Sequence, residues 1–310
     1  MSDVSPTASS ATTASSTGDL LRSAWPLRVV WLVVPVVAGP ALADALADRS
    51  RAVQVVASVL AWAGWAVGLG AMSILRSSTL TVVRVVVPGA LTVSIWSAIG
   101  AERPVWAAAG VGIGAVAALL LAAPGLSDSF VDGSSYGTER RVALKIPAAL
   151  LVLPVPLSWA AVAAGVVTGP LLLAASQWVL GAIACVVGSG LVFLGVRQLH
   201  LLSRRWIVFV PAGLVVHDPF SLTDPILFPR ASVVRVGPAA EGVASAADVV
   251  DSTGRALGLV LEVRSDDPVK VGIRSGRRVE ERDGVHALLV TPTQPAATLD
   301  IARSKRLPVG

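Results

Sequence analysis

The most constraining feature of this sequence is a long uncharged run near its middle, residues 170–196. The run reads PLLLAASQWVLGAIACVVGSGLVFLGV and ends abruptly at RQLHLLSRR. A helix rises about 1.5 Å per residue, so 27 uncharged residues are enough to cross a bilayer core of about 30 Å. Arg197, Arg204 and Arg205 follow at once, and basic residues at the end of a span favour the cytoplasmic side of a membrane. The run predicts a transmembrane helix, and these three arginines are its topology-setting candidates.

Five further apolar segments precede this run. Together with it they predict six transmembrane helices, at about 27–46, 53–75, 79–99, 104–123, 147–168 and 170–196. The last two are separated by a very short turn around 168–170, so we expect them to form an antiparallel hairpin. Charged residues make up only 15% of the chain, against about 25% in an ordinary soluble domain. The sequence therefore predicts an all-α membrane domain over residues 25–200.

Lys and Arg are distributed unevenly between alternate connections of these predicted helices. With a cytoplasmic N-terminus, the outer side collects Arg49, Arg51 and Arg103. The inner side collects ten basic residues: Arg22, Arg28, Arg76, Arg84, Arg140, Arg141, Lys145, Arg197, Arg204 and Arg205. This bias predicts a multi-pass protein of the cell membrane with both termini in the cytoplasm. Residues 1–24 are rich in Ser and Thr, which predicts a disordered cytoplasmic tail and no secretory signal.

After Trp206 the apolar period changes from helical to strand-like. Pro, Gly and Asp breaks separate short apolar segments, which predicts short antiparallel strands: IVFV, LVVHD, PILFP, ASVVRVG, ALGLVLEVR, PVKVGI and HALLVTP. The first two flank the turn Pro211-Ala212-Gly213 and predict a hairpin. The mixed-charge run 274–284 is expected to be a solvated turn or loop. Pro295 stands near the start of a predicted closing helix in TQPAATLDIARSKR. A small cytoplasmic β barrel capped by a C-terminal helix is therefore expected over residues 201–310.

The charge balance and the cysteine content exclude several classes of function. Residues 206–310 carry twelve basic and twelve acidic residues, so the net charge of +5 belongs entirely to residues 1–205. Because a nucleic-acid surface needs clustered basic residues on the soluble part, no nucleic-acid binding is expected. Cys185 is the only cysteine, and a lone thiol forms neither an intrachain disulfide nor a zinc site. No metal site and no cofactor are expected.

The longest connection between predicted helices is GLSDSFVDGSSYGTERRVALKIP, on the expected cytoplasmic side. Its mixed charge suits docking against the tail domain or a partner, through a candidate interaction loop of Asp132, Tyr136, Glu139, Arg140 and Arg141. The segment GSSYG within it matches the G-x-S-x-G elbow of serine hydrolases. That elbow needs a strand before the serine, a helix after it, and acid and histidine partners. Because a loop is expected before this serine, we expect a tight turn and no catalytic residue.

A transporter or channel subunit with a regulatory tail is the alternative function. Coupled carriers normally bury ionisable groups in their spans, yet no Asp, Glu, Lys or His lies in the middle of any predicted span. The strongest polar candidates for a path are Gln54, Ser176, Gln177 and Ser189. Such residues also serve as hydrogen-bond partners between helices. The favoured function is therefore a non-enzymatic membrane protein that displays a cytoplasmic interaction module.

The tail segments RWIVFVPAGLVVHD and HALLVTPTQPAATLDIAR resemble the bacterial pleckstrin-homology-like (PH-like) domains that follow transmembrane helices. The whole chain, with DSFVDGSSYGTERR in its central connection, resembles conserved multi-pass membrane proteins of actinobacterial type. The resemblance implies an interaction or regulatory domain and brings no catalytic residues. Eukaryotic pleckstrin-homology domains bind phosphoinositides through a basic first hairpin, whereas no Lys or Arg lies between Trp206 and Asp218 here. The expected partners are the lipid bilayer and a cytoplasmic or membrane protein.

Overall fold

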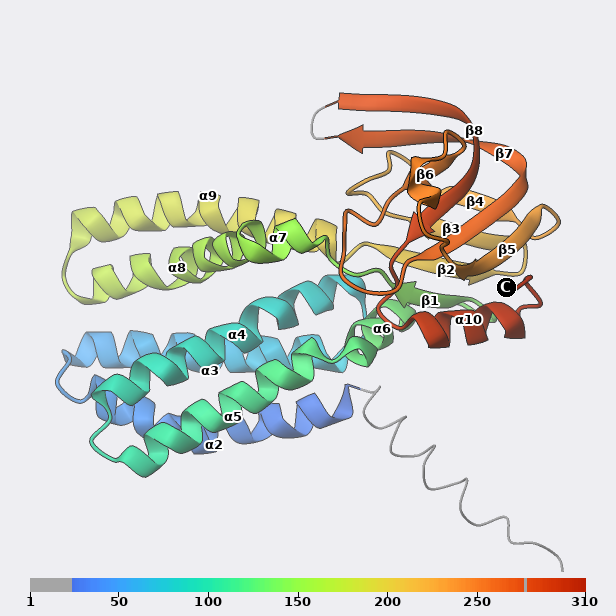
Figure 1. The fold of residues 1–310 in the computed structure, drawn as a ribbon. Helices are drawn as coiled ribbons and strands as arrows, with labels where there is room; N and C mark the ends of the chain where they lie inside the picture. The colour runs from blue at the N-terminus through green and yellow to red at the C-terminus, as the bar shows by residue number, and fades with distance from the viewer. Residues whose placement is uncertain (1–23, 276–277) are drawn as a thin grey trace, which may run out of the picture.

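The computed structural model describes residues 24–275 and 278–310. Among these residues, six helical segments are long and apolar enough to cross a membrane. They are α2 (Trp25–Leu46), α3 (Arg51–Ser73), α4 (Ser77–Gly100), α5 (Pro104–Ala122), α8 (Pro154–Ala174) with the short α7 (Ala148–Val152) before it, and α9 (Trp178–Leu202). The helices run side by side, and the β-rich tail domain lies at one end of them (Figure 1). The prediction of six long apolar helices is thus confirmed, while the predicted disordered tail lies outside the described residues except for Ala24.

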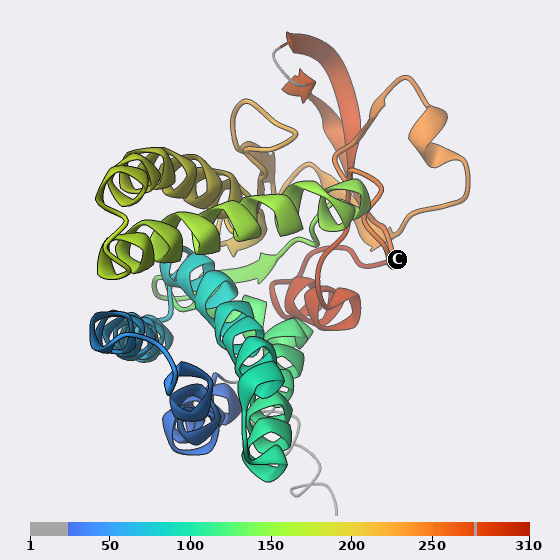
Figure 2. The same cartoon turned by 90° about the vertical axis from the view of Figure 1, so that its left-hand side faces the viewer.

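The helices fall into two groups. Viewed along their axes, α2, α3, α4 and α5 cluster together, and α8 and α9 form a hairpin beside them (Figure 2). The hairpin packs through glycine, because a Cβ on Gly165 or on Gly188 would lie 2.6 Å from the carbonyl oxygen of the other. Small residues allow such close approach of helix backbones.

The turn of this hairpin lies further along the chain than predicted. Helix α8 continues through Pro170 to Ala174, and Ser176, with φ of 63°, stands in the turn before α9. The predicted turn around 168–170, and with it a last span that begins at residue 170, is wrong. Proline removes a single backbone donor, whereas ending the helix there would leave several peptide groups unpaired in apolar surroundings.

The connection between α5 and α7 is not a simple loop. It forms α6 (Pro124–Asp132) and then the strand β1 (Arg140–Ala143). Leu126, Phe130 and Val131 of α6 are buried together with residues of α2, α3 and α4. Phe130 lies four positions after Leu126, a spacing that places both on one face of a helix, and Val131 follows directly. The connection therefore belongs to the hydrophobic core of the helices.

Two four-stranded sheets make up the tail domain. The first is antiparallel, in the order β1–β2–β3–β4, with β2 (Trp206–Val210), β3 (Gly213–His217) and β4 (Ile226–Pro229). The second has the order β5–β7–β8–β6, with β5 (Val233–Pro238), β6 (Val249–Asp251), β7 (Leu261–Ser275) and β8 (Arg278–Val290), and a 3₁₀ turn at Val243–Ser245. The predicted hairpin around 211–213 and the predicted closing helix, α10 (Pro295–Ser304), are both confirmed.

The predicted closed barrel is wrong. Within the described residues, a bridge between Leu222 and Ile273 joins the segment after β3 to β7, but the two sheets keep separate strand orders. Strand β6 also runs parallel to β8, although only antiparallel strands were expected. The core lies between the sheets, where Phe209 and Phe228 of the first meet Leu288 of the second. Packing of one sheet on the other buries these side chains without closing a barrel.

The mixed-charge run 274–284 is mostly strand and not the expected loop. Strands β7 and β8 form a long hairpin in which Lys270 and Glu281 make an ion pair of 2.5 Å, and Val271 and Val285 are fully buried. Strand β7 also passes through 266–268, where a break was expected, by a change of register between Arg264 and Val269. A bulge of this kind lets a strand accommodate proline.

Candidate functional site

A buried ion pair lies where the helices meet the tail domain. Arg205 and Asp218 have side chains only 1% and 0% exposed, and the guanidinium donates to both carboxylate oxygens at 2.8 Å. It also donates to the carbonyl oxygens of Lys145 at 2.6 Å and of Ser252 at 3.0 Å. Ser221 donates its hydroxyl to the same carboxylate. Because both charges are paired and hydrogen-bonded, this geometry offsets their desolvation.

The ion pair joins four segments of the chain. Arg205 follows α9, Asp218 follows β3, Lys145 precedes α7, and Ser252 follows β6. Any movement of the tail domain relative to α7 and α9 would therefore break contacts of a buried charge.

A second polar cluster surrounds Asp128 on α6. Its carboxylate accepts from the backbone N–H of Ala143 at 2.8 Å and from the hydroxyl of Thr293 at 2.7 Å. The side-chain amide of Gln294 donates to its other oxygen at 2.7 Å. Burial raises the pKa of Asp128 above its usual 3.8, and the three hydrogen bonds oppose part of that rise. Asp128 thus ties α6 to β1 and to the start of α10.

A third cluster joins α4 to α6 and α9. The half-buried Arg84 donates to the hydroxyls of Ser203 at 3.0 Å and Ser127 at 3.1 Å. One turn earlier, the hydroxyl of Thr81 lies 3.1 Å from Nδ1 of His200. The three clusters together fasten the tail-side ends of the helices to one another and to the tail domain.

The predicted interaction loop is partly built into this junction. Asp132 accepts from the backbone N–H of Arg141 at 2.9 Å and forms an ion pair of 3.1 Å with Arg140, and Glu139 lies 3.5 Å from Arg141. Arg140 and Arg141 belong to β1, which pairs with Phe209 and Val208 of β2. Tyr136 stands apart and is 81% exposed. The structure therefore brings the four charged residues together and leaves the tyrosine free for an outside contact.

The segment GSSYG lies between secondary-structure elements in the reverse order to that of the serine-hydrolase G-x-S-x-G elbow. It follows the helix α6 and precedes the strand β1, whereas the elbow follows a strand and precedes a helix. Ser135 donates its hydroxyl to the carboxylate of Asp132 at 2.8 Å. Gly137 has φ of 56°, a conformation that glycine adopts without strain. The segment is a turn, as predicted.

The topology-setting arginines have two different environments. Arg197 and Arg204 are exposed at the tail-side end of α9, whereas Arg205 is buried in its pair with Asp218. Sequence reasoning missed this pair, although a signal was present. Trp206 and His217 are the outermost partners of the β2–β3 hairpin, so the two residues just outside it, of opposite charge, face each other. Asp128 offered no comparable signal because Thr293 and Gln294 are far away in the sequence.

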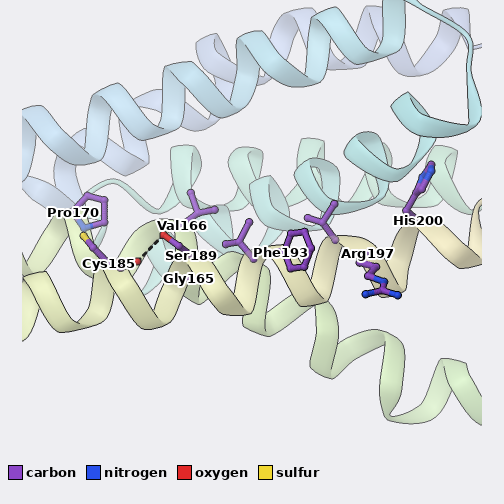
Figure 3. Close-up of a pocket in the computed structure, with 10 residues that line it drawn as sticks. Gly165, Val166, Pro170, Cys185, Ser189, Phe193, Arg197 and His200 are labelled. Atoms are coloured by element: carbon purple, nitrogen blue, oxygen red, sulfur yellow. Dashed lines mark hydrogen bonds between the residues drawn. The ribbon is translucent and has the colours of Figure 1, made fainter. Parts of the chain in front are cut away.

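An open groove of about 800 Å³ runs along the α8–α9 hairpin (Figure 3). Its lining is mostly apolar, and Phe193, Arg197 and His200 follow one another along α9 towards the tail domain. Ser189 is its one serine, and the hydroxyl donates to the carbonyl oxygen of Cys185 in the same helix at 2.8 Å. The groove therefore suits an apolar chain better than a polar substrate.

The other polar candidates for a transport path lie at helix ends. Ser176 and Gln177 stand in the turn between α8 and α9. Gln54 donates to the carbonyl oxygens of Ala47 and Arg49, at 3.1 and 3.0 Å, and so completes the turn before α3. Three of the four candidates thus lie outside the middle of a span.

Among residues 24–275 and 278–310, no group of three or more His, Cys, Asp and Glu side chains is placed to hold a metal ion. No family model matches the chain, and no curated protein or solved structure shows significant similarity to it.

Proposed function

We propose that this chain is a non-enzymatic integral membrane protein whose tail domain is a cytoplasmic interaction or regulatory module. Six long apolar helices support membrane insertion. The excess of Lys and Arg in alternate connections supports cytoplasmic termini in the cell membrane. In this proposal the partners are the bilayer and a cytoplasmic or membrane protein.

The observation that carries the proposal is the way in which the tail domain is attached. Its first sheet takes β1 from the connection between α5 and α7, and β2 from the segment directly after α9. The Arg205–Asp218 pair and the Asp128 cluster fix the same two attachments. A partner that shifts β1 or β2 would therefore also move α6, α7 and α9. That coupling is what a regulatory module on a membrane protein requires.

We also propose that the tail domain is PH-like and that the chain is related to actinobacterial multi-pass proteins. Two facing sheets with α10 packed on their core support the first point. The β2–β3 hairpin lacks basic residues, so its chemistry favours a protein partner over a phosphoinositide. The second point depends on the composition and the central connection of the sequence alone.

The orientation is tested with a cysteine on the surface of the tail domain. Leu227 is half-exposed on β4, so Leu227→Cys in a Cys185→Ser background provides a single reactive thiol. A membrane-impermeant maleimide should label it in inside-out vesicles and not on intact cells. Labelling on intact cells would place the tail domain outside and overturn the proposal.

The interaction is tested in the whole chain, because a fragment of residues 201–310 lacks β1. A photo-crosslinking amino acid at Tyr136, at Leu227 or at Val279 of β8 places a probe on three exposed parts of the tail side. The same residue at Val186, exposed in the middle of α9, is the matched control. We expect a discrete protein adduct from at least one tail-side position and not from Val186. The proposal fails if all four positions give the same adducts, or if no position gives a protein adduct.

A further inference from the structure

The segment 253–259 of the tail domain has an unusual apolar surface. Leu257 is 75% exposed and Leu259 is 50% exposed, and Leu257 is the most exposed large apolar side chain that the structure describes in the tail domain. Both lie in the connection between β6 and β7. Large apolar side chains that gather on an exposed surface mark a contact with something other than water.

The backbone of this segment presents the two leucines outward. Gly254, Arg255 and Gly258 all have positive φ, of 58°, 58° and 131°. Ala256, between them, is buried, and its N–H donates to the carbonyl oxygen of Thr253 at 3.2 Å. The turn is therefore anchored by Ala256 while its leucines point away from the core of the tail domain.

This segment lies where the chain begins the α7–α8 span. The ammonium of Lys145 donates to the carbonyl oxygen of Leu257 at 2.8 Å. A Cβ on Gly254 would lie 2.7 Å from Cγ of Pro147, and the apolar span Ala148–Ala174 begins at the next residue. No residue of α7 is buried, and Val152 at its end is 81% exposed. The leucines therefore continue the apolar surface of a candidate transmembrane segment.

Two cations lie at the exposed part of the segment, and one carboxylate, that of Asp251, accepts from the backbone N–H of Thr253 at its start at 2.8 Å. Lys145 touches it, Arg255 is exposed within it, and residues 252–261 contain no Asp or Glu. Apolar side chains flanked by cations are typical of protein surfaces that sit in the interface of an anionic bilayer.

We propose that residues 253–259 insert into the boundary between headgroups and acyl chains of an anionic bilayer. Leu257 and Leu259 enter the apolar side, while Lys145 and Arg255 contact lipid phosphates. The tail domain then has a lipid contact of its own in addition to its attachments to the helices. This inference rests on the proposed membrane insertion of α7–α8.

The test measures depth with spin labels on the whole chain in a Cys185→Ser background. Labels are placed one at a time at Leu257→Cys, Leu227→Cys and Val186→Cys, in vesicles of phosphatidylcholine and phosphatidylglycerol. Paramagnetic relaxation by oxygen, which partitions into lipid, is compared with relaxation by a water-soluble nickel chelate. We expect the oxygen-to-nickel ratio at residue 257 to exceed that at residue 227 several-fold and to approach that at residue 186.

The controls separate the two proposals. A label at residue 257 that is as accessible to nickel as the label at 227, while the label at 186 is in lipid, overturns this inference alone. A label at 186 that is accessible to nickel overturns membrane insertion itself. If Leu257→Cys fails to fold, Leu259→Cys replaces it.

The role of anionic lipid is tested separately. We expect Arg255→Gln, or vesicles of phosphatidylcholine alone, to make the label at residue 257 lie less deep in the bilayer. An unchanged depth in both experiments would overturn the role of anionic lipid.

Discussion

The α8–α9 hairpin and the tail domain use the same apolar residue types in opposite ways. On α9 the buried positions include Gly181, Gly188 and Gly195, while Val186 and Phe193 face outward. In the tail domain Phe209 and Phe228 are fully buried. Helices that pack through small residues and expose large ones are adapted to lipid, whereas the tail domain buries its large residues as proteins in water do. The surface of the α8–α9 hairpin therefore suits lipid and that of the tail domain suits water, and the boundary between the two lies near Arg205.

The strongest test of this boundary removes one partner of its buried ion pair. Asp218→Ala leaves the guanidinium of Arg205 buried without a counter-charge, so we expect a loss of about 3–5 kcal/mol in tail-domain stability. The loss is measured by heating the whole chain in detergent, with the protease resistance of the tail domain as the readout of unfolding.

A matched control separates burial from charge. Asp300 and Arg303 form a solvent-exposed pair on α10, so Asp300→Ala should change the unfolding temperature little. The double variant Arg205→Met with Asp218→Leu should recover most of the loss, because an apolar pair needs no compensation. Equal effects of Asp218→Ala and Asp300→Ala would contradict the assignment of this boundary.

The packing of the helices is tested by two glycines on the same helix. Gly188→Ala puts a Cβ at 2.6 Å from the carbonyl oxygen of Gly165, whereas Gly190→Ala meets nothing within 4 Å. We expect Gly188→Ala to destabilise the α8–α9 hairpin by about 1–3 kcal/mol. Unfolding temperature in detergent measures the effect, and Gly190→Ala should leave it unchanged or raise it. Equal losses for the two variants would show that the helices do not pack through this contact.

A smaller effect is expected from a polar contact inside the helix group. Trp31 and Trp65 each donate their indole N–H to the backbone carbonyl of the other, at 2.9 Å. Trp31→Phe keeps much of the ring but removes one hydrogen bond, so a loss of about 0.5–1.5 kcal/mol is expected. The helix signal in circular dichroism during heating measures it. Because Trp96 is exposed on α4, Trp96→Phe is the control and should have almost no effect.

The smallest expected effect is a pH dependence from Asp128. Its pKa is raised in the folded protein, so the folded state binds a proton more readily than the unfolded state. The contribution of Asp128 to folding stability is therefore fully present below about pH 4. It is lost as the pH rises through the raised pKa that Asp128 has in the folded protein. Asp128→Asn cannot ionise. The difference in unfolding temperature, wild type minus variant, should fall as the pH rises, and a constant difference would contradict this.

Local patterns predicted the elements that depend on nearby residues. The apolar runs, the β2–β3 hairpin and α10 follow from period, turn residues and Pro295. The same patterns did not predict the elements whose formation depends on residues far away in the sequence. Strand β1 is only four residues long and forms because β2 offers it a sheet edge, while β6 has three residues and depends on β8. The turn predicted around Pro170 failed because proline removes one backbone donor, whereas ending α8 there would leave several peptide groups unpaired in apolar surroundings.

The candidate site shows the same division. The sequence singled out the charged residues of the interaction loop, and the structure places Arg140 and Arg141 on β1 beside Asp132. Asp128 was not found, because its role depends on Thr293 and Gln294. Long-range hydrogen bonds leave no periodic trace in a sequence.

The sequence by itself determined that this chain has a helical half suited to lipid and a β-rich half suited to water. Hydrophobicity and its period are local properties of the sequence, and they indicate whether a segment is better accommodated in lipid or in water. Only the tertiary structure decided that the two halves share a sheet, and that a buried pair and a buried carboxylate join them. Those contacts connect residues far apart along the chain, and their free energy exists only once both partners have been brought together.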